Sequence, residues 1–272
     1  MAVVLYGAMN FPIKPLADEI EKIAGLGFDY LELAMDPPCA HYTTINRSKT
    51  GLLQSLGQYD LKLVCHLPCF VYTGDLTPSI RDASLNEMLA SLDTASDLGA
   101  MKVVLHPSAV SGMGAFVRET AGSYAMESLH AIVERAGELG IRLCFENMFP
   151  RYMNCSEPME LSAVFNRFPS LRMTLDTGHA NIGDPTGNRI FDFIQAFGDR
   201  IDHIHVSDNF GKIDDHLPVG RASINFSRFA RAIRAMGYNK TITLEVFSDD
   251  PRDLVRSRDT ISALLGEGPG KA

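Results

Sequence analysis

Short apolar runs alternate with longer amphipathic stretches along the whole chain. Eight runs rich in Val, Ile and Leu have the length of buried strands, at residues 3–9, 28–35, 61–67, 102–106, 141–147, 171–176, 201–207 and 241–247. Between them, apolar residues recur with helical spacing, for example at 15–25, 85–98, 126–139 and 226–236. Several of these stretches end at a glycine directly before the next strand, as at Gly99, Gly140 and Gly237. Glycine tolerates the left-handed conformation that closes a helix, so these positions support the assignment.

This alternation predicts an α/β fold, a single (β/α)8 TIM barrel. Parallel strands need helical crossovers, and eight strand–helix units close economically into a barrel. The length of 272 residues fits, since such a barrel takes about 250. An open doubly wound sheet is the alternative, but no GxGxxG follows the first strand. We expect a catalytic barrel over residues 1–265 and a flexible tail over 266–272.

Composition narrows the class of protein. No apolar run approaches the roughly 18 residues of a membrane span, and the first residues lack the features of a signal peptide. The net charge is −8, from 25 Lys+Arg and 33 Asp+Glu, and no basic run marks a nucleic-acid stripe. The five cysteines include no CxxC pair, which predicts reduced thiols and a cytoplasmic location. We expect no zinc staple between Cys65 and Cys69.

One alternating set of strand positions is polar, although a barrel interior is normally filled with branched apolar side chains. Residues two apart in a strand share a face, so these polar side chains point into the barrel together. They are Tyr30, Glu32, His66, Lys102, His106, Arg142, Glu146, Arg172, Asp176, His203, His205, Thr243 and Glu245. Many stand at the carboxyl ends of strands, which converge on the active-site mouth of a barrel.

The residues at these ends and in the following loops are of metal-ligating types. The candidates are His66, His106, Glu146, Asp176, His179, His205, Asp214, His216 and Glu245. A buried carboxylate is costly unless it is paired or coordinated, and His, Asp and Glu bind Zn²⁺, Mn²⁺ and related ions. One buried histidine alone is ordinarily a hydrogen-bonded core residue, but six strand ends that deliver such groups to one mouth predict a metal site. His203 and Glu32 lie deeper, and we expect them to have structural or supporting roles.

Seven motifs resemble the xylose isomerase-like TIM-barrel superfamily, which includes sugar phosphate isomerases and epimerases and endonuclease IV. They are HLP at 66–68, VVLHPS at 103–108, FEN at 145–147, LDTGHA at 175–180, HIHVSDN at 203–209, DDHLPVG at 214–220 and LEVF at 244–247. The motifs cover almost the whole chain, in the order of the strands.

The resemblance implies different metal counts for different branches. In the epimerase branch, one metal would be held by Glu146, Asp176, His205 and Glu245. The endonuclease branch binds three zinc ions and would add His66, His106, His179, Asp214 and His216. The full set is present, so we expect one to three divalent ions, which could be Zn²⁺, Mn²⁺ or Mg²⁺. Ketose 3-epimerases carry a further Glu and Arg where this chain has Tyr152 and Gly211, which argues against that activity.

Two chemistries can use these residues. In an isomerase or epimerase, a metal would stabilise the charge that develops when a carbon beside a carbonyl loses its proton. Glu146 and Glu245 would move that proton from opposite sides, and His179 would polarise or orient a substrate oxygen. In a hydrolase, two or three metals would clamp a phosphate, with Glu146 bridging a pair.

Loop cations bear on the substrate. Arg151, Lys212 and Arg221 follow the fifth and seventh strands and could bind a phosphate or carboxylate. Three scattered cations suffice for one phosphate but are few for a nucleic-acid strand. We therefore predict a metal-dependent sugar or sugar-phosphate isomerase or epimerase with a small-molecule substrate and no membrane partner. The alternative is an endonuclease IV-like phosphoester hydrolase acting on abasic-site DNA, and only then would nucleic acid be a partner. The oligomeric state stays open.

Overall fold

Eight parallel strands form a closed barrel, in which each strand pairs with the next one in the chain and β8 pairs with β1. The computed structural model describes residues 4–110, 112–150 and 155–266. The strands are β1 (Leu5–Met9), β2 (Tyr30–Ala34), β3 (Lys62–His66), β4 (Val103–Leu105), β5 (Leu143–Glu146), β6 (Arg172–Asp176), β7 (Ile201–Val206) and β8 (Thr241–Leu244). The predicted (β/α)8 fold class is confirmed.

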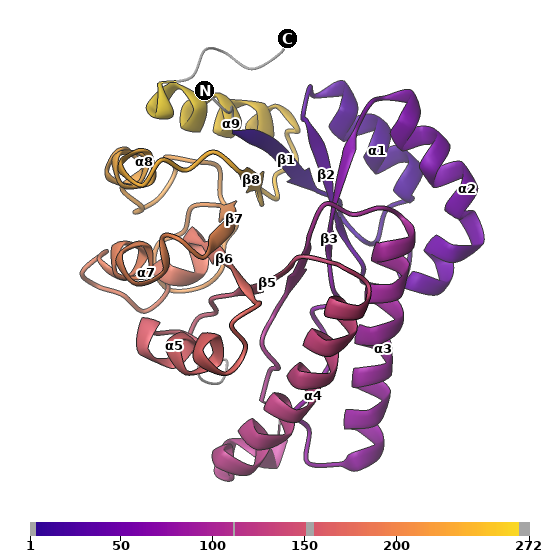
Figure 1. The fold of residues 1–272 in the computed structure, drawn as a ribbon. Helices are drawn as coiled ribbons and strands as arrows, with labels where there is room; N and C mark the ends of the chain where they lie inside the picture. The colour runs from indigo at the N-terminus through magenta and orange to yellow at the C-terminus, as the bar shows by residue number, and fades with distance from the viewer. Residues whose placement is uncertain (1–3, 111, 151–154, 267–272) are drawn as a thin grey trace.

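Helices surround the barrel (Figure 1). They are α1 (Leu16–Gly25), α2 (Tyr42–Gln58), α3 (Pro78–Asp97), α4 (Arg118–Glu138), α5 (Pro158–Arg167), α6 (Thr177–Asn181), α7 (Arg189–Phe197), α8 (Phe226–Ala235) and α9 (Arg252–Leu265), with a 3₁₀ turn η1 (Gly112–Phe116) before α4. Helices α3 and α4 pack side by side and extend beyond the barrel (Figure 1). Among the described helices, none has the length and apolarity needed to cross a membrane.

Two helices begin earlier than their apolar spacing indicates. Helix α3 begins at Pro78 rather than near residue 85, because proline suits the first turn, where its missing N–H is not needed. Helix α4 begins at Arg118 rather than near 126, since its first turns are polar. At the other end of the chain, Gly266 closes α9 in the left-handed conformation, and the rest of the predicted tail lies outside the described residues.

The apolar core lies mainly between the strands and the helices. Inside the barrel, the described residues include only a small apolar cluster built on Tyr30, Val64 and Val104. At the amino ends of the strands, the carboxylate of Asp202 forms ion pairs with Lys102 at 2.8 Å, Lys240 at 3.1 Å and Arg142 at 3.2 Å. The polar strand positions therefore divide into a salt-bridged end and the opposite, carboxyl end.

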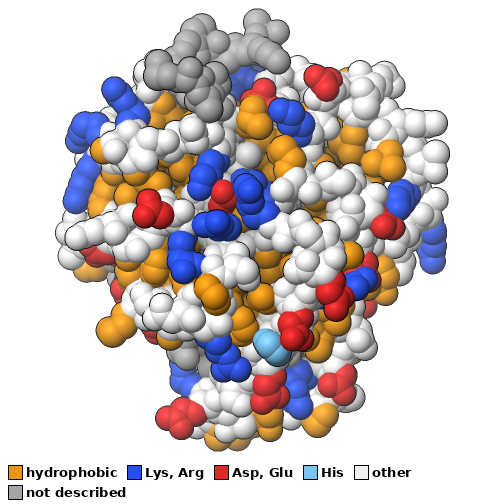
Figure 2. Space-filling view, in the orientation of Figure 1, with side chains coloured by type: hydrophobic (Ala, Val, Ile, Leu, Met, Phe, Trp, Pro, Cys, Tyr) orange, Lys and Arg blue, Asp and Glu red, His pale blue; other side chains and the backbone are white. Residues whose placement is uncertain are grey.

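Figure 2 shows the surface from the same side as Figure 1. Lys and Arg side chains gather near the middle of this face, and acidic side chains are interspersed among and around them. This face therefore carries no extended stripe of a single charge of the kind that tracks a nucleic-acid backbone.

Gly7 of β1 is required by the packing inside the barrel. A Cβ atom at this position would overlap the ring of Tyr30, which is fully buried on the neighbouring strand. We expect Gly7→Ala to lower the free energy of unfolding by about 1–3 kcal/mol, the usual cost of overpacking a core. Urea unfolding of the purified protein measures this. Gly51→Ala is the matched control, because Gly51 lies in α2 and an added Cβ there would meet no atom within 4 Å beyond the adjoining backbone of its own helix. A Gly7→Ala variant as stable as the control would contradict this packing.

Candidate functional site

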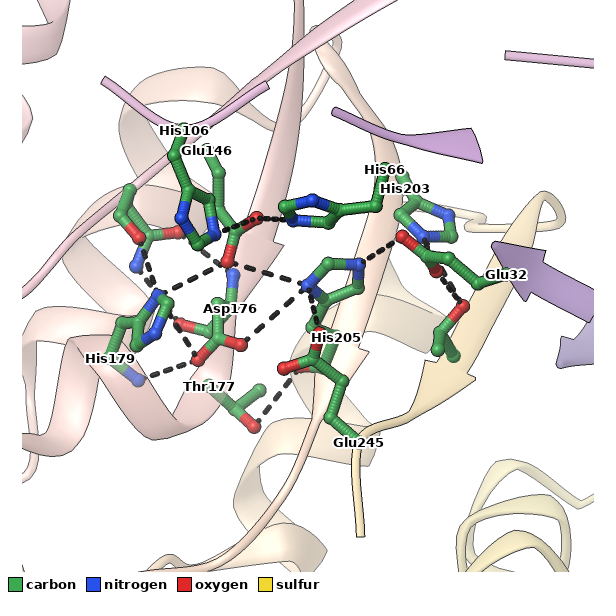
Figure 3. Close-up of polar contacts among 12 residues, drawn as sticks. Glu32, His66, His106, Glu146, Asp176, Thr177, His179, His203, His205 and Glu245 are labelled. Atoms are coloured by element: carbon green, nitrogen blue, oxygen red, sulfur yellow. Dashed lines mark hydrogen bonds and ion pairs between the residues drawn. The ribbon is translucent and has the colours of Figure 1, made fainter. Parts of the chain in front are cut away.

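The nine predicted ligands converge at the carboxyl ends of strands β3 to β8. Figure 3 labels all of them except Asp214 and His216. His66, Glu146 and Asp176 are the last residues of β3, β5 and β6, and His205 lies in β7. His106 follows β4, Glu245 follows β8, His179 lies in α6, and Asp214 and His216 lie in the loop after β7. Six of these side chains are buried, and His106, Asp214 and His216 are partly exposed, so the barrel holds a cluster of largely buried titratable groups.

His205 stands at the centre of the cluster, and its Nδ1 atom faces three carboxylates. It lies 3.2 Å from Glu245 Oε1, 3.3 Å from Glu146 Oε1 and 3.7 Å from Asp176 Oδ2. Within the described part of the chain, His205 Nδ1, Asp176 Oδ2 and both oxygens of Glu146 are buried without a hydrogen-bond partner. A buried polar atom without a partner costs about 1–3 kcal/mol. Converging lone pairs of this kind fit a divalent cation, and the three carboxylates and one imidazole suit Zn²⁺, Mn²⁺ or Mg²⁺.

Asp176 is held by two neighbouring motifs. Its Oδ1 accepts a hydrogen bond from the backbone N–H of His179 at 2.5 Å and so caps the short helix α6, while Oδ2 stays directed into the cluster. The side chain of Asn147 accepts from the Asp176 N–H at 2.8 Å and donates to its carbonyl at 3.0 Å. Asn147 thereby fixes the end of β6 against the end of β5. The motif FEN contains this residue, but the sequence assigns it no role.

Glu32 of β2 orients His205 from the opposite side of the barrel. The Nε2–H of His205 donates to Glu32 Oε1 at 2.9 Å, and that of His203 donates to Glu32 Oε2 at 2.9 Å. The hydroxyl of Thr243 also donates to Glu32 Oε2. Because the carboxylate only accepts, Nε2 carries a proton in both the neutral and the charged form of His205, and Nδ1 is the nitrogen that faces the cluster and could bind a cation once it is deprotonated. This geometry gives Glu32 the supporting position expected from its low place in the strand.

Two further groups flank this centre. On one side, His106 Nε2 and His66 Nε2 lie 3.2 and 3.5 Å from Glu146 Oε2. On the other side, Asp214 Oδ2 lies 3.0 Å from His216 Nε2 and 3.2 Å from His179 Nε2. The structure therefore brings together all nine residues as three adjoining groups, with Glu146 shared between two of them.

Asp208 shapes the loop that carries Asp214 and His216. Its carboxylate accepts backbone hydrogen bonds from Gly220 at 3.1 Å, Ala222 at 2.8 Å and Ile224 at 3.1 Å. These bonds fold the loop back over the end of β7. This role of Asp208 is not predicted from the sequence. The position of Asp208 in HIHVSDN, directly after an apolar strand, is a signal that could have indicated a buried aspartate. His216 adopts the left-handed backbone region at φ 47°, which is uncommon for a residue other than glycine.

The buried charges shift one another's pKa values. Burial opposes ionisation of Glu146, but the nearby His205 and His106 outweigh it and hold the pKa of Glu146 well below its usual range. Burial raises the pKa of Asp176 to about 7, and the carboxylates of Glu245 and Glu146 add to the effect although His179 opposes it. Burial would lower the pKa of His205, but the surrounding carboxylates raise it well above the usual value. The cluster therefore exerts a strong attraction for positive charge.

An open cavity of about 290 Å³ lies over the cluster. Its ionisable lining consists of Asp36, His66, Cys69, His106, His179, Asp214, His216 and Glu245. Its remaining wall is apolar and consists of Met9, Phe11, Pro12, Ala34, Phe70, Met148, Phe149 and Phe247. No Lys or Arg of the described residues lines this cavity.

Two of the three predicted substrate-binding cations, Lys212 and Arg221, are not brought to this cavity. Lys212 is exposed and borders a separate surface hollow beside Asn181 and Phe210. Arg221 is exposed and lines neither space. Arg151 lies outside the described residues.

Comparison with known proteins places these features in a wider group. A family model described as xylose isomerase-like TIM barrel matches residues 20–264. The uncharacterized protein MJ1311 of Methanocaldococcus jannaschii is 30% identical, over 95% of this chain and 87% of the relative. The L-ribulose-5-phosphate 3-epimerase UlaE of Escherichia coli is 21% identical, over 89% of this chain and 87% of the relative. A solved structure of a D-tagatose 3-epimerase-like protein superposes with a TM-score of 0.84 at 24% identity, covering 97% of each chain.

Replacing the Glu32 carboxylate tests whether its hydrogen bond to His205 Nε2 positions that histidine. We expect Glu32→Gln to weaken zinc binding to the chelator-treated protein by about 10–100-fold, as is usual when the hydrogen-bond partner of a metal-binding histidine is lost. Isothermal titration with zinc measures the affinity. Glu19→Gln is the control, because Glu19 is equally buried but lies in α1, where it accepts from Phe11 N–H and Lys22. Equal affinities in the two variants would show that Glu32 does not position His205.

The pair His216–Asp214 makes the stability of the metal-free protein depend on pH. Burial lowers the pKa of His216, but the hydrogen bond to Asp214 and the charge of Glu245 outweigh it and raise that pKa to about 9. The unfolded value is about 6.5, so the stabilisation is complete below pH 6.5 and is lost as the pH rises to about 9.

In the presence of a chelator, we therefore expect the melting temperature to fall by several degrees between pH 6.5 and 9. His216→Gln should flatten this dependence, whereas replacing the exposed His130 with Gln should not. Thermal melts at a series of pH values measure the slope. An unchanged slope in His216→Gln would contradict the assignment.

Proposed function

The chain belongs to the xylose isomerase-like TIM barrel family, and we propose that it is a divalent-metal-dependent isomerase or epimerase of a sugar or sugar phosphate. The observation that carries this proposal is the central group, in which unpartnered oxygens of Glu146 and Asp176 surround the unpartnered Nδ1 of His205. Glu245 completes the group and also borders the cavity. A cation-binding centre at the floor of a small cavity is the arrangement that carbonyl chemistry on a small polar molecule requires.

The donor set fits a divalent cation held by Glu146, Asp176, His205 and Glu245. When bound, such a cation would supply Lewis-acid stabilisation of the negative charge that develops on the oxygens of a hydroxy-carbonyl group. The protein's contribution is to hold these donors rigidly. Asn147 and the α6 cap fix Asp176, and Glu32 fixes His205.

Two carboxylates are available to move a proton. Glu146 and Glu245 approach His205 from different sides (Figure 3), from the ends of β5 and β8. Glu245 borders the cavity and would accept the proton from the carbon beside the carbonyl. Glu146 lies deeper, ionised and in contact with His106 and His179, and would serve the opposite side of that carbon. His179 lines the cavity and would orient a substrate hydroxyl.

The cavity wall offers packing surface for the proposed class of substrate. Phe11, Phe70, Phe149 and Phe247 present apolar surface on which the carbon–hydrogen faces of a sugar can pack. Free ketoses and aldoses and their phosphates are therefore tested side by side.

Names of the relatives support the reaction class. UlaE is named as an L-ribulose-5-phosphate 3-epimerase, and the similar solved structure is titled as D-tagatose 3-epimerase-like. Tyr152 and Gly211 stand where the ketose 3-epimerase pattern has Glu and Arg. We therefore propose the reaction class without assigning the carbon.

A metal-dependent phosphoester hydrolase is the second candidate. The two flanking groups favour this hydrolase, because they bring more donor atoms than one cation needs. They consist of His66 and His106 beside Glu146, and of His179, Asp214 and His216. Several adjoining cations are typical of enzymes that clamp a phosphate.

Deuterium exchange tests the proposal. Zinc- or manganese-loaded protein is incubated in deuterated water with a panel of aldoses, ketoses and their phosphates, and uptake at carbon is followed by NMR. We expect exchange with at least one sugar, reduced by at least about 100-fold in Glu146→Gln and in Glu245→Gln, since general acid–base catalysis contributes that much. Glu134→Gln, an exposed residue of α4, is the control.

The same preparations are also incubated with duplex DNA that carries one abasic site. Strand cleavage that is lost in Glu146→Gln, without deuterium uptake by any sugar, would replace the proposed function with the hydrolase. Near-normal exchange in both Gln variants would remove these carboxylates from the reaction.

A further inference from the structure

A second open space adjoins the cavity over the cluster. This outer groove, of about 410 Å³, is lined by residues of the loops that follow β1, β2 and β3 and by one residue of α3. Phe11, Pro12, Asp36 and Phe70 line both spaces, so the groove continues the cavity outward across this part of its rim. Its size lies within the range of about 300–1,000 Å³ that is typical of ligand sites. The cavity and the groove together can therefore hold a longer molecule than the cavity alone.

Two phenylalanines lie where the two spaces meet. The side chain of Phe70 is 78% exposed and that of Phe11 is 39% exposed, although both line a concave surface. Exposed apolar groups that gather at one place on a surface commonly mark a binding site. The apolar face of a phenyl ring packs against the carbon–hydrogen face of a sugar ring. These two rings therefore offer packing surface to a sugar unit that lies outside the cavity.

Two carboxylates supply the polar side of the groove. Asp36 lies at the junction with the cavity, and its Oδ1 accepts from the Cys69 N–H at 3.1 Å. Glu87 of α3 lines the groove alone, and its Oε2 accepts from His41 Nε2–H at 2.8 Å. The second oxygen of each carboxylate has no hydrogen-bond partner within the part of the chain that the structure describes. A carboxylate only accepts hydrogen bonds, and sugar hydroxyls are the donors that match it.

Hydrogen bonds between the loops hold the groove in shape. The Cys39 N–H donates to the carbonyl of Pro12 at 3.0 Å and joins the loop after β2 to the loop after β1. The bond to Asp36 joins the loop after β3 to the loop after β2, and the pair of His41 and Glu87 joins that loop to α3. A groove that is already formed loses less conformational freedom when a ligand binds.

We propose that the outer groove is a subsite for a second sugar unit, and that the substrate is a disaccharide whose carbonyl-bearing unit enters the cavity. This inference rests on the proposed function, because the reacting unit at the cluster is what places the second unit in the groove. The second unit packs its carbon–hydrogen face on Phe11 and Phe70 and donates from its hydroxyls to Asp36 and Glu87. The bond between the two units is neither formed nor broken in the reaction.

Binding of sugar alcohols tests the subsite without using the reaction. Maltitol and cellobiitol each carry a glucose unit on an open-chain glucitol, and neither has a carbonyl beside which a proton could be removed. We expect the zinc-loaded full chain to bind at least one of them about 3–10-fold more tightly than glucitol, the gain that one good aromatic contact supplies. Ligand-observed NMR titration measures the three affinities. In the same samples, saturation transfer from the protein should reach the protons of the second glucose unit as well as those of the glucitol unit.

Variants of the groove locate the gain in affinity. Phe70→Ala and Glu87→Ala should each lower the ratio of disaccharide-alcohol affinity to glucitol affinity toward one. Phe116→Ala is the control for the first, because Phe116 is 81% exposed and lines neither space. Glu134→Ala is the control for the second, because Glu134 also pairs with a histidine, His130 at 3.3 Å, but lies on the surface of α4. Both controls should leave the ratio unchanged.

Equal affinity of the unmodified chain for glucitol and for both disaccharide alcohols would overturn the proposal. A ratio that is the same in Phe70→Ala and Glu87→Ala as in the unmodified chain would overturn it as well. These outcomes are separate from the deuterium experiment, because the sugar alcohols cannot react. Failure of deuterium exchange together with a gain in affinity would remove the proposed reaction and leave the subsite.

Discussion

The site is organised around buried carboxylate oxygens that have no hydrogen-bond donor among the described residues. Both oxygens of Glu146 and one of Asp176 lie inside the barrel beside an imidazole nitrogen that also has no partner within the described chain. Such a group is stable only if positive charge compensates it. Histidines such as His179 and His205 supply part of this charge, because the neighbouring carboxylates raise their pKa values well above the usual value. A bound cation would meet the remainder, which is why the chemistry of the donors points to a metal.

The barrel supplies the rigidity that this arrangement needs. Glu32 reaches from β2 to His203 and His205 on β7, two strands that are far apart in the sequence but face each other across the interior. The same carboxylate also accepts from Thr243, whose hydroxyl contacts Tyr30 at 2.7 Å. Glu32, His203 and Thr243 thus form a polar layer that lies between the apolar cluster around Tyr30 and the candidate metal ligands. Loss of one member should disturb metal binding before it disturbs the fold.

The flanking groups give the site more donors than one cation can use. His66 and His106 approach one oxygen of Glu146, while His179, Asp214 and His216 form a further group nearby. The cavity above them is small, and its apolar wall, which includes four phenylalanines, can pack against a small molecule.

The barrel and the strand-end cluster can both be predicted from the residue pattern. Strand and helix periodicities differ, and glycines stop the helices, so the eight units and the inward-facing polar residues can be read from the pattern. Parallel strand ends must then meet, which brings residues such as Glu146 and Glu245 together. The contacts of the loop side chains are seen only in the folded molecule, because loops have no periodicity from which a direction can be inferred. The fold directs the thiol of Cys69 toward His66, whereas nothing in the residue pattern distinguishes Cys69 from Cys65. It also left Lys212 and Arg221 away from the cavity, since the side chain of a loop residue is directed by the contacts of its loop and not by its distance from a strand.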